Sequence, residues 1–403
     1  MWQSIKNFYH LAMAVLANVF YGFPSKKLTV IGVTGTDGKT TTVNLIYHIL
    51  KTAGKQVSMI SSVGAVINGK NYDTGFHVTT PSSWQLQSFL KKAEGYLVLE
   101  VTSHALDQYR VWGINFAVGV LTNVTNEHLD YHKTYENYAA TKAKLLKIAK
   151  VAVVNKDDEA YGIIAESEWI TYGLSNNSDV NPENFPFKTK LVGEFNKYNI
   201  LAGAAAGRAL GIDNPAIRKA ISSFKLPIGR MEVVHPSTSS GQVDFTVMID
   251  FAHTPNALEQ VLSTVKKNTK GRLIHVFGSA GERDFQKRPE MGRVSGKYAD
   301  VIILTAEDPR SESVEKITDR IEEGIRKLEV RSQPPEASLA KGGKLEVRKI
   351  ADRQEAITTA VKMVKKGDVV IITGKGHEQS MNYGKGEVAW SEHEAVKQAL
   401  KKR

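Results

Sequence analysis

A glycine-rich stretch that ends in lysine and threonine carries the clearest chemical signal in this sequence. Residues 32–42 read GVTGTDGKTTT, and the Gly-Lys-Thr at residues 38–40 matches the end of a phosphate-binding loop. The general pattern places another glycine five residues before residue 38, where this chain has Val33. The stretch is therefore either a turn with a chance lysine or a nucleotide loop with displaced glycines.

The segments on either side favour a nucleotide loop. Leu28–Val33 is a β-branched apolar run, typical of a buried strand, and Thr42–Leu50 has apolar residues near helical spacing. Glycines let backbone N–H groups approach a phosphate, and a helix N-terminus adds partial positive charge. Lys39 supplies a full charge, and the hydroxyl of Thr40 is an oxygen ligand of the kind that Mg²⁺ prefers.

Polar side chains also follow two other apolar runs. Glu100 ends the run in LVLEVTSHALDQYR, and the run in LTNVTNEHLDYH is followed by Glu127, His128, Asp130 and His132. Open α/β sheets bind ligands where their strands end. A carboxylate near a nucleotide loop could hold Mg²⁺, but imidazole is an unusual ligand for that ion. A structural role for His128 therefore stays equally open.

Composition narrows the class of partner. The chain of 403 residues is long enough for two or three domains, and its lack of cysteine excludes disulfides, zinc–thiolate sites and cysteine nucleophiles. A net charge of +11 is compatible with nucleic acid, a membrane surface or anionic small substrates. Because arginine-rich tracts and basic–aromatic repeats are missing from the sequence, we expect no nucleic-acid partner.

Residues 1–26 are expected to form a helical segment of their own. Their apolar run, from Leu11 to Phe23, is too short and too interrupted to span a bilayer, and no clear cleavage site follows it. We expect a helix docked on the following domain. A helix lying on a membrane surface, as a peripheral contact, is the alternative.

Apolar runs alternate with helical stretches along the rest of the chain. This βαβ pattern predicts an α/β fold, with a central P-loop-type ATPase domain built on a mostly parallel sheet over 27–226 and a Rossmann-like α/β domain over 227–403. Residues 331–344 are predicted to form a surface loop. The other predicted strands are Val57–Ser61, Tyr96–Thr102, Phe116–Val124, Val151–Asn155, Phe245–Phe251, Arg272–Phe277, Val301–Thr305 and Val369–Thr373.

A series of short motifs resembles, in content and order, the Mur ligases of the MurE type, which add the third peptide residue to a UDP-MurNAc-dipeptide in peptidoglycan synthesis. The motifs are GVTGTDGKTTT, TTP (79–81), EVTSHALDQYR, TNVTNEHLDYHKTYENYAATK, GEFNKYN, GRMEVV, DFAHTPNAL, GERDFQKRP, EDPR and GKGHE. The resemblance covers about residue 25 to the C-terminus. It also accounts for the displaced glycines, because the family's own loop reads G-T-[ND]-G-K-T.

The resemblance implies a ligase that uses ATP and Mg²⁺. In this family ATP phosphorylates the donor carboxylate, and the acceptor amine attacks the acyl phosphate to give an amide. The residues implied to bind ATP are Gly35, Thr36, Asp37, Gly38, Lys39, Thr40, Thr41, Asn196, Arg230 and Asp250. The implied metal ligands and catalytic groups are Lys39, Thr40, Glu100, His128 and Lys142. Lys142 is similar in position to the lysine that is carbamylated in these enzymes.

The resemblance also implies two substrates, a muramyl-dipeptide donor and a diamino acid acceptor. The implied donor contacts are Thr79, Thr80, Thr102, Ser103, Gln108, Arg110 and His253. The implied acceptor contacts are Arg283, Asp308, Arg310, Gly374 and Glu378. The EDPR motif implies meso-diaminopimelate, because Arg310 would bind its distal carboxylate; a loop arginine in a surface ion pair is the alternative. Three positions depart from the family pattern, with Thr102 in place of serine, Phe251 of tyrosine and Asp308 of asparagine.

Full-length relatives begin with a uridine-diphosphate-binding domain that we expect this chain to lack. The carrier of the donor therefore stays open between UDP, a lipid and none. One alternative function is a folylpolyglutamate-synthase-like ligase, whose loop usually reads G-K-G-S and which lacks the HLDYH motif. The other is a non-catalytic muropeptide-binding module, which the joint presence of Lys39, Glu100, His128 and Lys142 disfavours. We expect a cytoplasmic monomer.

Overall fold

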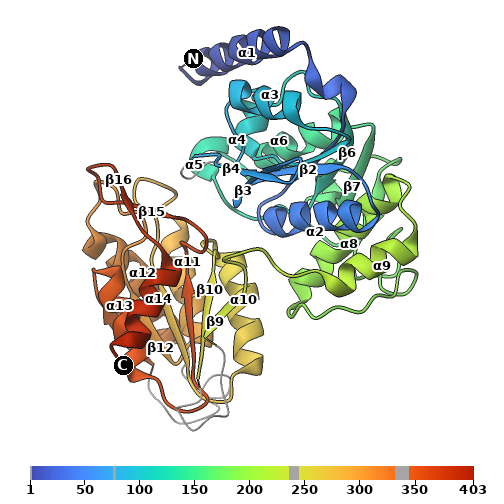
Figure 1. Cartoon of the computed structure of the whole chain (residues 1–403). Coiled ribbons are helices and arrows are strands. Elements are labelled where there is room, and N and C mark those ends of the chain that lie inside the picture. Colours follow the sequence, from blue (N-terminus) through green and yellow to red (C-terminus); the bar gives the residue numbers. More distant parts are fainter. Residues whose placement is uncertain (1, 76–78, 236–244, 332–344) are drawn as a thin grey trace. The chain divides into compact units, whose positions relative to one another are not determined.

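The described residues form two compact units, which divide the chain after residue 227. Figure 1 shows the helices and strands of both units. The computed structural model describes residues 2–75, 79–235, 245–331 and 345–403. The loop predicted over residues 331–344 lies outside these ranges, apart from residue 331, which ends a helix.

The first unit is built on one large sheet. Its strands are β1 (Thr29–Thr34), β2 (Val57–Ser61), β3 (Gly64–Ile67), β4 (Lys70–Tyr72), β5 (Tyr96–Glu100), β6 (Phe116–Leu121), β7 (Val151–Asn155) and β8 (Ile170–Tyr172). In the described residues they lie in the order β4-β3-β2-β5-β1-β6-β7-β8. All neighbours pair in parallel except β2 with β3 and β3 with β4, which form an antiparallel edge.

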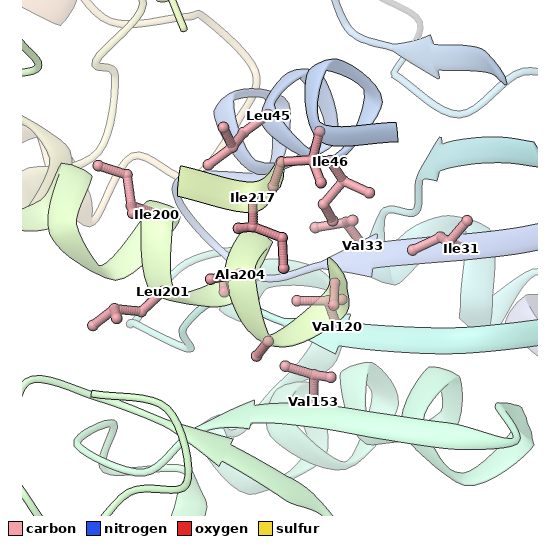
Figure 2. Packing of buried hydrophobic residues seen from close by; sticks show 14 of the residues in the cluster. Ile31, Val33, Leu45, Ile46, Val120, Val153, Ile200, Leu201, Ala204 and Ile217 are labelled. Carbon is pink, nitrogen blue, oxygen red and sulfur yellow. The ribbon is translucent and has the colours of Figure 1, made fainter. Parts of the chain in front are cut away.

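Helices cover both faces of this sheet, as the sequence pattern predicts. One face carries α2 (Lys39–Thr52), α8 (Glu194–Ala209) and α9 (Asn214–Ser223), whose apolar residues form one core cluster with β1, β6 and β7 (Figure 2). The other face carries α3 (Ser83–Lys92), α4 (Ser103–Asp107) and α6 (Tyr135–Ile148). The short helices α5 (Leu129–His132) and α7 (Tyr161–Ile164) belong to the connections.

Strand β1 lies in the middle of the sheet and contributes side chains to the apolar clusters on both of its faces. Successive side chains of a strand point to opposite faces, so Ile31 and Val33 join the α2 side while Val30 joins the α3 side. Gly32 faces α6, where a Cβ atom would come within 2.8 Å of the side chains of Leu145 and Phe116. This glycine therefore allows α6 to pack closely beneath the strand that leads into the phosphate loop.

The N-terminal segment forms a helix that is docked on the first unit. Helix α1 (Trp2–Tyr21) is followed by the 3-10 turn η1 (Pro24–Lys27). The buried Asn18 side chain donates to the carbonyl of Trp112 at 2.8 Å, and the Phe20 ring lies 5.4 Å from that of Trp84 on α3. Within the described ranges, no helix has both the length and the hydropathy needed to cross a bilayer.

The second unit is a smaller α/β structure. Its strands are β9 (Glu232–His235), β10 (Thr246–Asp250), β11 (Leu273–Phe277), β12 (Val301–Leu304), β13 (Glu346–Lys349) and β14 (Val369–Thr373). In the described residues their order is β13-β12-β11-β14-β10-β9, and only β9 pairs antiparallel. Its other elements are α10 (Pro255–Asn268), α11 (Lys287–Tyr298), α12 (Val314–Arg331), α13 (Arg353–Met363), α14 (Glu392–Lys401) and the hairpin β15 (Ser380–Asn382)–β16 (Glu387–Ala389).

A buried histidine joins three elements of this second unit. His275 on β11 is fully buried, and its two ring nitrogens lie 2.8 Å from the Ser295 hydroxyl and 3.0 Å from the Thr373 hydroxyl. Its ring also stacks on Phe277 at 4.2 Å. Burial, and next the charge of Arg353, lower the pKa of His275 to about 3. The imidazole is therefore neutral in the folded protein at neutral and mildly acidic pH.

We expect His275 to make the second unit sensitive to acid. In the unfolded chain a histidine has a pKa of about 6.5, so below that pH the unfolded state binds a proton that the folded state refuses until about pH 3. The stabilisation is complete above pH 6.5 and is lost as the pH falls. Relative to His275→Gln, the wild type should lose roughly 2 kcal/mol of unfolding free energy between pH 6.5 and 5. Urea unfolding of both proteins across this range tests the expectation, which parallel stability curves would contradict.

Candidate active site

The phosphate loop is residues 35–38, between β1 and α2. Gly35 and Gly38 have φ angles of +150° and +78°, and Gly38 caps α2. The loop is fastened to the end of β6, because the N–H groups of Thr36 and Asp37 donate to the backbone and side-chain oxygens of Asn123 at 2.8 and 2.9 Å. A Cβ atom at Gly35 would lie 1.8 Å from the Thr122 hydroxyl oxygen, so this close attachment requires glycine.

Two strand ends meet beside the first turn of α2. The hydroxyl of Thr40 donates to the buried carboxylate of Glu100 at the end of β5, at 3.1 Å, and lies 2.9 Å from the hydroxyl of Ser62 after β2. The N–H of Ser62 donates to the same carboxylate at 3.0 Å. Lys39 donates to the carbonyl of Thr36 at 2.8 Å. Ser62 is a site residue that the sequence analysis missed, although it directly follows a predicted strand.

Lys142 lies directly against the phosphate loop. It is buried on α6, its Nζ atom donates to the carbonyl of Gly35 at 2.7 Å, and the Tyr138 ring centroid is 4.2 Å from Nζ. Burial, and next the charge of Lys39, hold the pKa of the Lys142 amine well below its usual range, against the opposing pull of Glu127. A helix-surface lysine would show neither the burial nor the shift in pKa.

His128 lies in the loop after β6, next to the buried carboxylate of Glu127. It has a left-handed backbone (φ 55°), and its Nε2 atom is 3.8 Å from the carboxylate of Glu127. Its ring lies 4.9 Å from the ring of His104 on α4. The sequence pattern singled out Glu127 beside His128, but the family resemblance did not include it among the implied metal ligands. Its burial and its effect on Lys142 mark it as part of the site.

The residues predicted to bind the donor lie around the end of β5, apart from His253, which belongs to the second unit. Thr80 donates to the carbonyl of Glu100 at 2.9 Å, and Thr102 caps α4 by accepting from the N–H of Ala105 at 3.1 Å. Arg110 donates to the Thr80 carbonyl at 3.3 Å and to the Gln108 side chain at 2.6 Å. Ser103 lies 3.0 Å from His132, and Thr79 precedes Thr80 in the chain.

A buried asparagine pair supports the loop from α8. Asn199, which the sequence analysis did not select, donates to the side-chain oxygen of Asn196 at 3.3 Å and accepts from Thr42 at 3.4 Å. Its side-chain oxygen lies 2.3 Å from the position that a Cβ atom on Gly38 would take. Asn196, which was predicted to contact adenine, donates to the carbonyl of Val192 at 2.7 Å. Asn199 is thus the direct link between α8 and the phosphate loop.

In the second unit, the predicted nucleotide contacts gather at the end of β10. The buried carboxylate of Asp250 accepts from the N–H groups of Met231 and Ala252, both at 2.7 Å. The Arg230 guanidinium lies 4.4 Å from the centroid of the Phe251 ring, and the His253 ring lies 4.8 Å from it. Phe251 thus orients two predicted site residues through its ring, which does not need the missing hydroxyl.

Two of the predicted acceptor residues, Asp308 and Glu378, are joined in the second unit by a lysine that the prediction did not include. Lys375 is fully buried, and its Nζ atom contacts the carboxylates of Asp308 at 2.7 Å and Glu378 at 2.6 Å. Asp308 also accepts from the N–H of Asn382 at 2.9 Å. The available signal was the GKGHE motif itself, from which only the flanking positions were selected.

Arg310 and the neighbouring loops complete this region. Arg310 has φ 52° and donates to the carbonyl of Gly281, at 2.7 Å, in the loop that also carries the exposed Arg283. Gly374 has φ 107°, and a Cβ atom there would lie 2.1 Å from Glu307 Oε2. Glu307 is buried, and burial raises the pKa of its carboxyl. Gly374 therefore has to be glycine to accommodate that carboxyl.

Comparison with known proteins decides the family. Residues 33–207 match the Mur ligase middle domain, and residues 229–376 match the Mur ligase, glutamate ligase domain. A relative from Aquifex aeolicus (strain VF5), named UDP-N-acetylmuramoyl-L-alanyl-D-glutamate–2,6-diaminopimelate ligase, is 39% identical over 96% of this chain and 81% of its own length. This chain belongs to the Mur ligase family. Its members are ADP-forming ligases of acids with amino acids.

Other relatives of this Mur ligase agree. A protein of the same name from Geobacillus kaustophilus (strain HTA426) is 38% identical over 97% of this chain and 83% of its own length. A solved structure of a ligase with this name is 30% identical, with a TM-score of 0.55, and covers 93% of this chain and 78% of that one. Folylpolyglutamate synthase from Mycobacterium tuberculosis, complexed with ADP and AMPPCP, is 17% identical, with a TM-score of 0.67 and coverages of 90% and 92%. The last comparison shows a shared fold and nothing more.

We expect Gly38→Ala to disrupt the phosphate loop of this Mur ligase. The added Cβ atom would meet the Asn199 oxygen at 2.3 Å, and both groups are held in place. Gly54→Ala is the matched control, because Gly54 lies just after the other end of α2 with φ +72° and has open space around it. Both substitutions carry the strain of a left-handed backbone, roughly 1 kcal/mol, and only the first adds a clash. ATP binding measured by calorimetry should be lost in Gly38→Ala alone; equal affinity in the two variants would contradict the assignment.

Proposed function

We propose that this Mur ligase joins a diamino acid, meso-diaminopimelate, to a MurNAc-L-Ala-D-Glu donor at the expense of ATP in peptidoglycan precursor synthesis. The observation that carries the proposal is the pair of relatives named for this reaction at 38% and 39% identity, each matched over nearly the whole chain. The predicted site residues also form compact networks within each unit. A cytoplasmic location goes with the proposal as a prediction.

The reaction requires several anions to come together. The donor carboxylate takes the terminal phosphoryl group of ATP, the acceptor amine attacks the resulting carbonyl carbon, and phosphate leaves as the amide forms. Lys39, in the first turn of α2, lies where a phosphate on the loop would be bound, so its charge would offset the repulsion between phosphate and carboxylate. The donor network around Thr80 and Arg110 would hold the carboxylate against this group.

The residues beside the loop also suit Mg²⁺. This ion prefers oxygen ligands, usually keeps several waters, and is bound by one or two carboxylates together with substrate phosphates. The Thr40 hydroxyl and Glu100 carboxylate are such oxygens, 3.1 Å apart beside the loop. The described residues contain no cluster of three or more His, Asp or Glu side chains arranged for a metal, which is compatible with an ion held mainly by phosphate and water. When bound, Mg²⁺ would withdraw negative charge from the phosphate being transferred.

Lys142 would act as a carbamate. An amine adds to carbon dioxide only when it is neutral, and releases a proton as the N–C bond forms. The burial of Lys142 and the low pKa of its amine favour the neutral form. The carbamate would place oxygen ligands next to the carbonyl of Gly35 and would convert a neutral amine into an anion beside Lys39. His128 stays a predicted metal ligand, with Glu127 as its neighbour.

We expect Lys142→Ala to lower the rate of ligation by about 10²-fold or more, because charge stabilisation beside the reacting groups would be lost. A short carboxylic acid added to the assay should restore part of the rate by occupying the space of the carbamate. Lys147→Ala is the control, since Lys147 lies on the same helix with its side chain 58% exposed, paired with Glu166. Phosphate release is the measurement. Unchanged activity of Lys142→Ala without any additive would rule out this role.

The second unit supports an acceptor that carries a distal carboxylate. Asp308, the departure from the family's asparagine, could have neutralised an arginine of the pocket. Its carboxylate instead contacts the buried Lys375, whereas Arg310 donates to a neutral carbonyl of Gly281. The positive charge of Arg310 is therefore suited to an incoming carboxylate, which diaminopimelate has and lysine lacks.

We expect the chain to prefer meso-diaminopimelate over lysine, because a site built for a charged group rejects an analogue without it by about 10⁴-fold or more. Arg310→Ala should reduce this preference strongly. Arg326→Ala is the control, since Arg326 lies on α12 with its side chain 71% exposed. The measurement is kcat/KM for both acceptors. Equal use of lysine by the wild type, or an unchanged ratio in Arg310→Ala, would contradict the assignment.

Two other functions are less well supported. A folylpolyglutamate synthase has the same fold at 17% identity, and that similarity carries no substrate information. A non-catalytic muropeptide-binding module would not need Lys142 to be buried against the phosphate loop. ATP hydrolysis that depends on the muramyl-dipeptide would distinguish a ligase from such a module.

A further inference from the structure

Helix α1 turns an apolar face to the outside of the first unit. Its large exposed side chains, between 55% and 73% accessible, are Ile5, Phe8, Tyr9, Leu16, Val19 and Phe20. Their spacing of three, four and seven residues places them along one side of the helix, over nearly its whole length. We call this surface the α1 stripe. A contiguous exposed apolar surface of this kind on a globular unit marks a binding surface.

The opposite side of α1 packs against the rest of the first unit. Ala14, Ala17 and Asn18 are buried, and Asn7 donates to the carboxylate of Asp107 on α4 at 3.1 Å. Gln3 donates to the hydroxyl of Tyr131 on α5 at 2.7 Å. The helix is thus fixed along its length by its inner side. The α1 stripe therefore belongs to the surface of the folded first unit, because the helix that carries it is docked.

The charged side chains of the N-terminal segment itself have one sign, and the Asp107 carboxylate contacts α1 on its inner side, opposite the α1 stripe. Residues 1–36 contain three lysines and no acidic residue. Lys6 is exposed on α1, and Lys26 and Lys27 are exposed in η1, directly after the helix. Lysines that flank an apolar helix face suit a surface with apolar depth and anionic groups at its edge, which is the composition of an anionic lipid bilayer.

We propose that α1 binds the surface of an anionic lipid bilayer, lying along it with the α1 stripe in the acyl boundary and the three lysines at the headgroups. A second copy of this chain suits the surface less well. Two such helices packed stripe to stripe would bring lysines together with no acidic residue in either segment to pair with them. The inference is independent of the substrates of the ligase, because it uses no residue of the active site.

The test is co-sedimentation of the full chain with vesicles. The wild type should bind vesicles of phosphatidylcholine with phosphatidylglycerol more tightly than vesicles of phosphatidylcholine alone, and added salt should weaken the binding. The double variant Phe8→Ser/Val19→Ser should lower the partition coefficient by about 100-fold or more, since each exposed apolar side chain contributes roughly a tenfold factor. Lys26→Gln and Lys27→Gln should each lower it by roughly fivefold.

Matched controls separate this surface from general stickiness. Ile148→Ser/Ile163→Ser removes two apolar side chains of the same unit that are 53% and 52% exposed, and it should leave binding unchanged. In addition, brominated lipid should quench the fluorescence of a tryptophan introduced as Phe8→Trp. This measurement does not require the serine variant to fold. Absence of wild-type binding to anionic vesicles, or equal loss in the control, would overturn the proposal. So would a concentration-dependent dimer, seen by sedimentation, that Phe8→Ser/Val19→Ser dissociates while vesicles have no effect.

Discussion

The candidate site of the first unit depends on the contact between the Lys142 amine and the carbonyl of Gly35 in the phosphate loop. An ammonium group is costly to bury, so the surroundings decide its state. Burial, and next the charge of Lys39, lower the pKa of the amine and favour its neutral form, while Glu127 and Asp37 oppose them. This balance sets the local charge where phosphate and carboxylate would meet. It also links α6 to the loop, so the geometry of nucleotide binding and the proposed carbamate chemistry rest on the same side chain.

The parallel sheet explains why the other groups lie close by. The carboxyl ends of neighbouring parallel strands share one edge, which brings Glu100 and Ser62 to Thr40 although they are distant in the sequence. Close packing of the helices then requires small residues at particular places. Gly32 admits α6, and Gly203 on α8 admits Leu45 of α2, where a Cβ atom would come within 2.8 Å. The apolar core therefore fixes the position of the polar edge.

The second unit holds two carboxylates close to one buried lysine. The carboxylates of Asp308 and Glu378 would repel each other if no cation lay between them. The buried Lys375 contacts both and supplies that positive charge. An acceptor amine would therefore have to compete with Lys375 for these carboxylates, and their direct contact with the acceptor stays a prediction. The same arrangement leaves the charge of Arg310 available to a carboxylate. The change from asparagine to aspartate is thus offset within the protein, and it need not change the class of acceptor.

By itself, the sequence determined the α/β class, the parallel strands and the phosphate loop, because those depend on local patterns of apolar residues and glycines. It did not reveal the short strands β3, β4, β8, β9 and β13, which lie at or next to the sheet edges and lack a long apolar run. Only the tertiary structure showed that Ser62, Asn199 and Lys375 belong to the candidate sites. Their roles come from contacts with residues far away in the chain, such as Glu100, Gly38 and Asp308, and no local spacing encodes those contacts. Helical spacing places Lys142 on the apolar side of α6, three or four residues from Tyr138 and Leu145, but only the packing of α6 against β1 brings its amine to the carbonyl of Gly35.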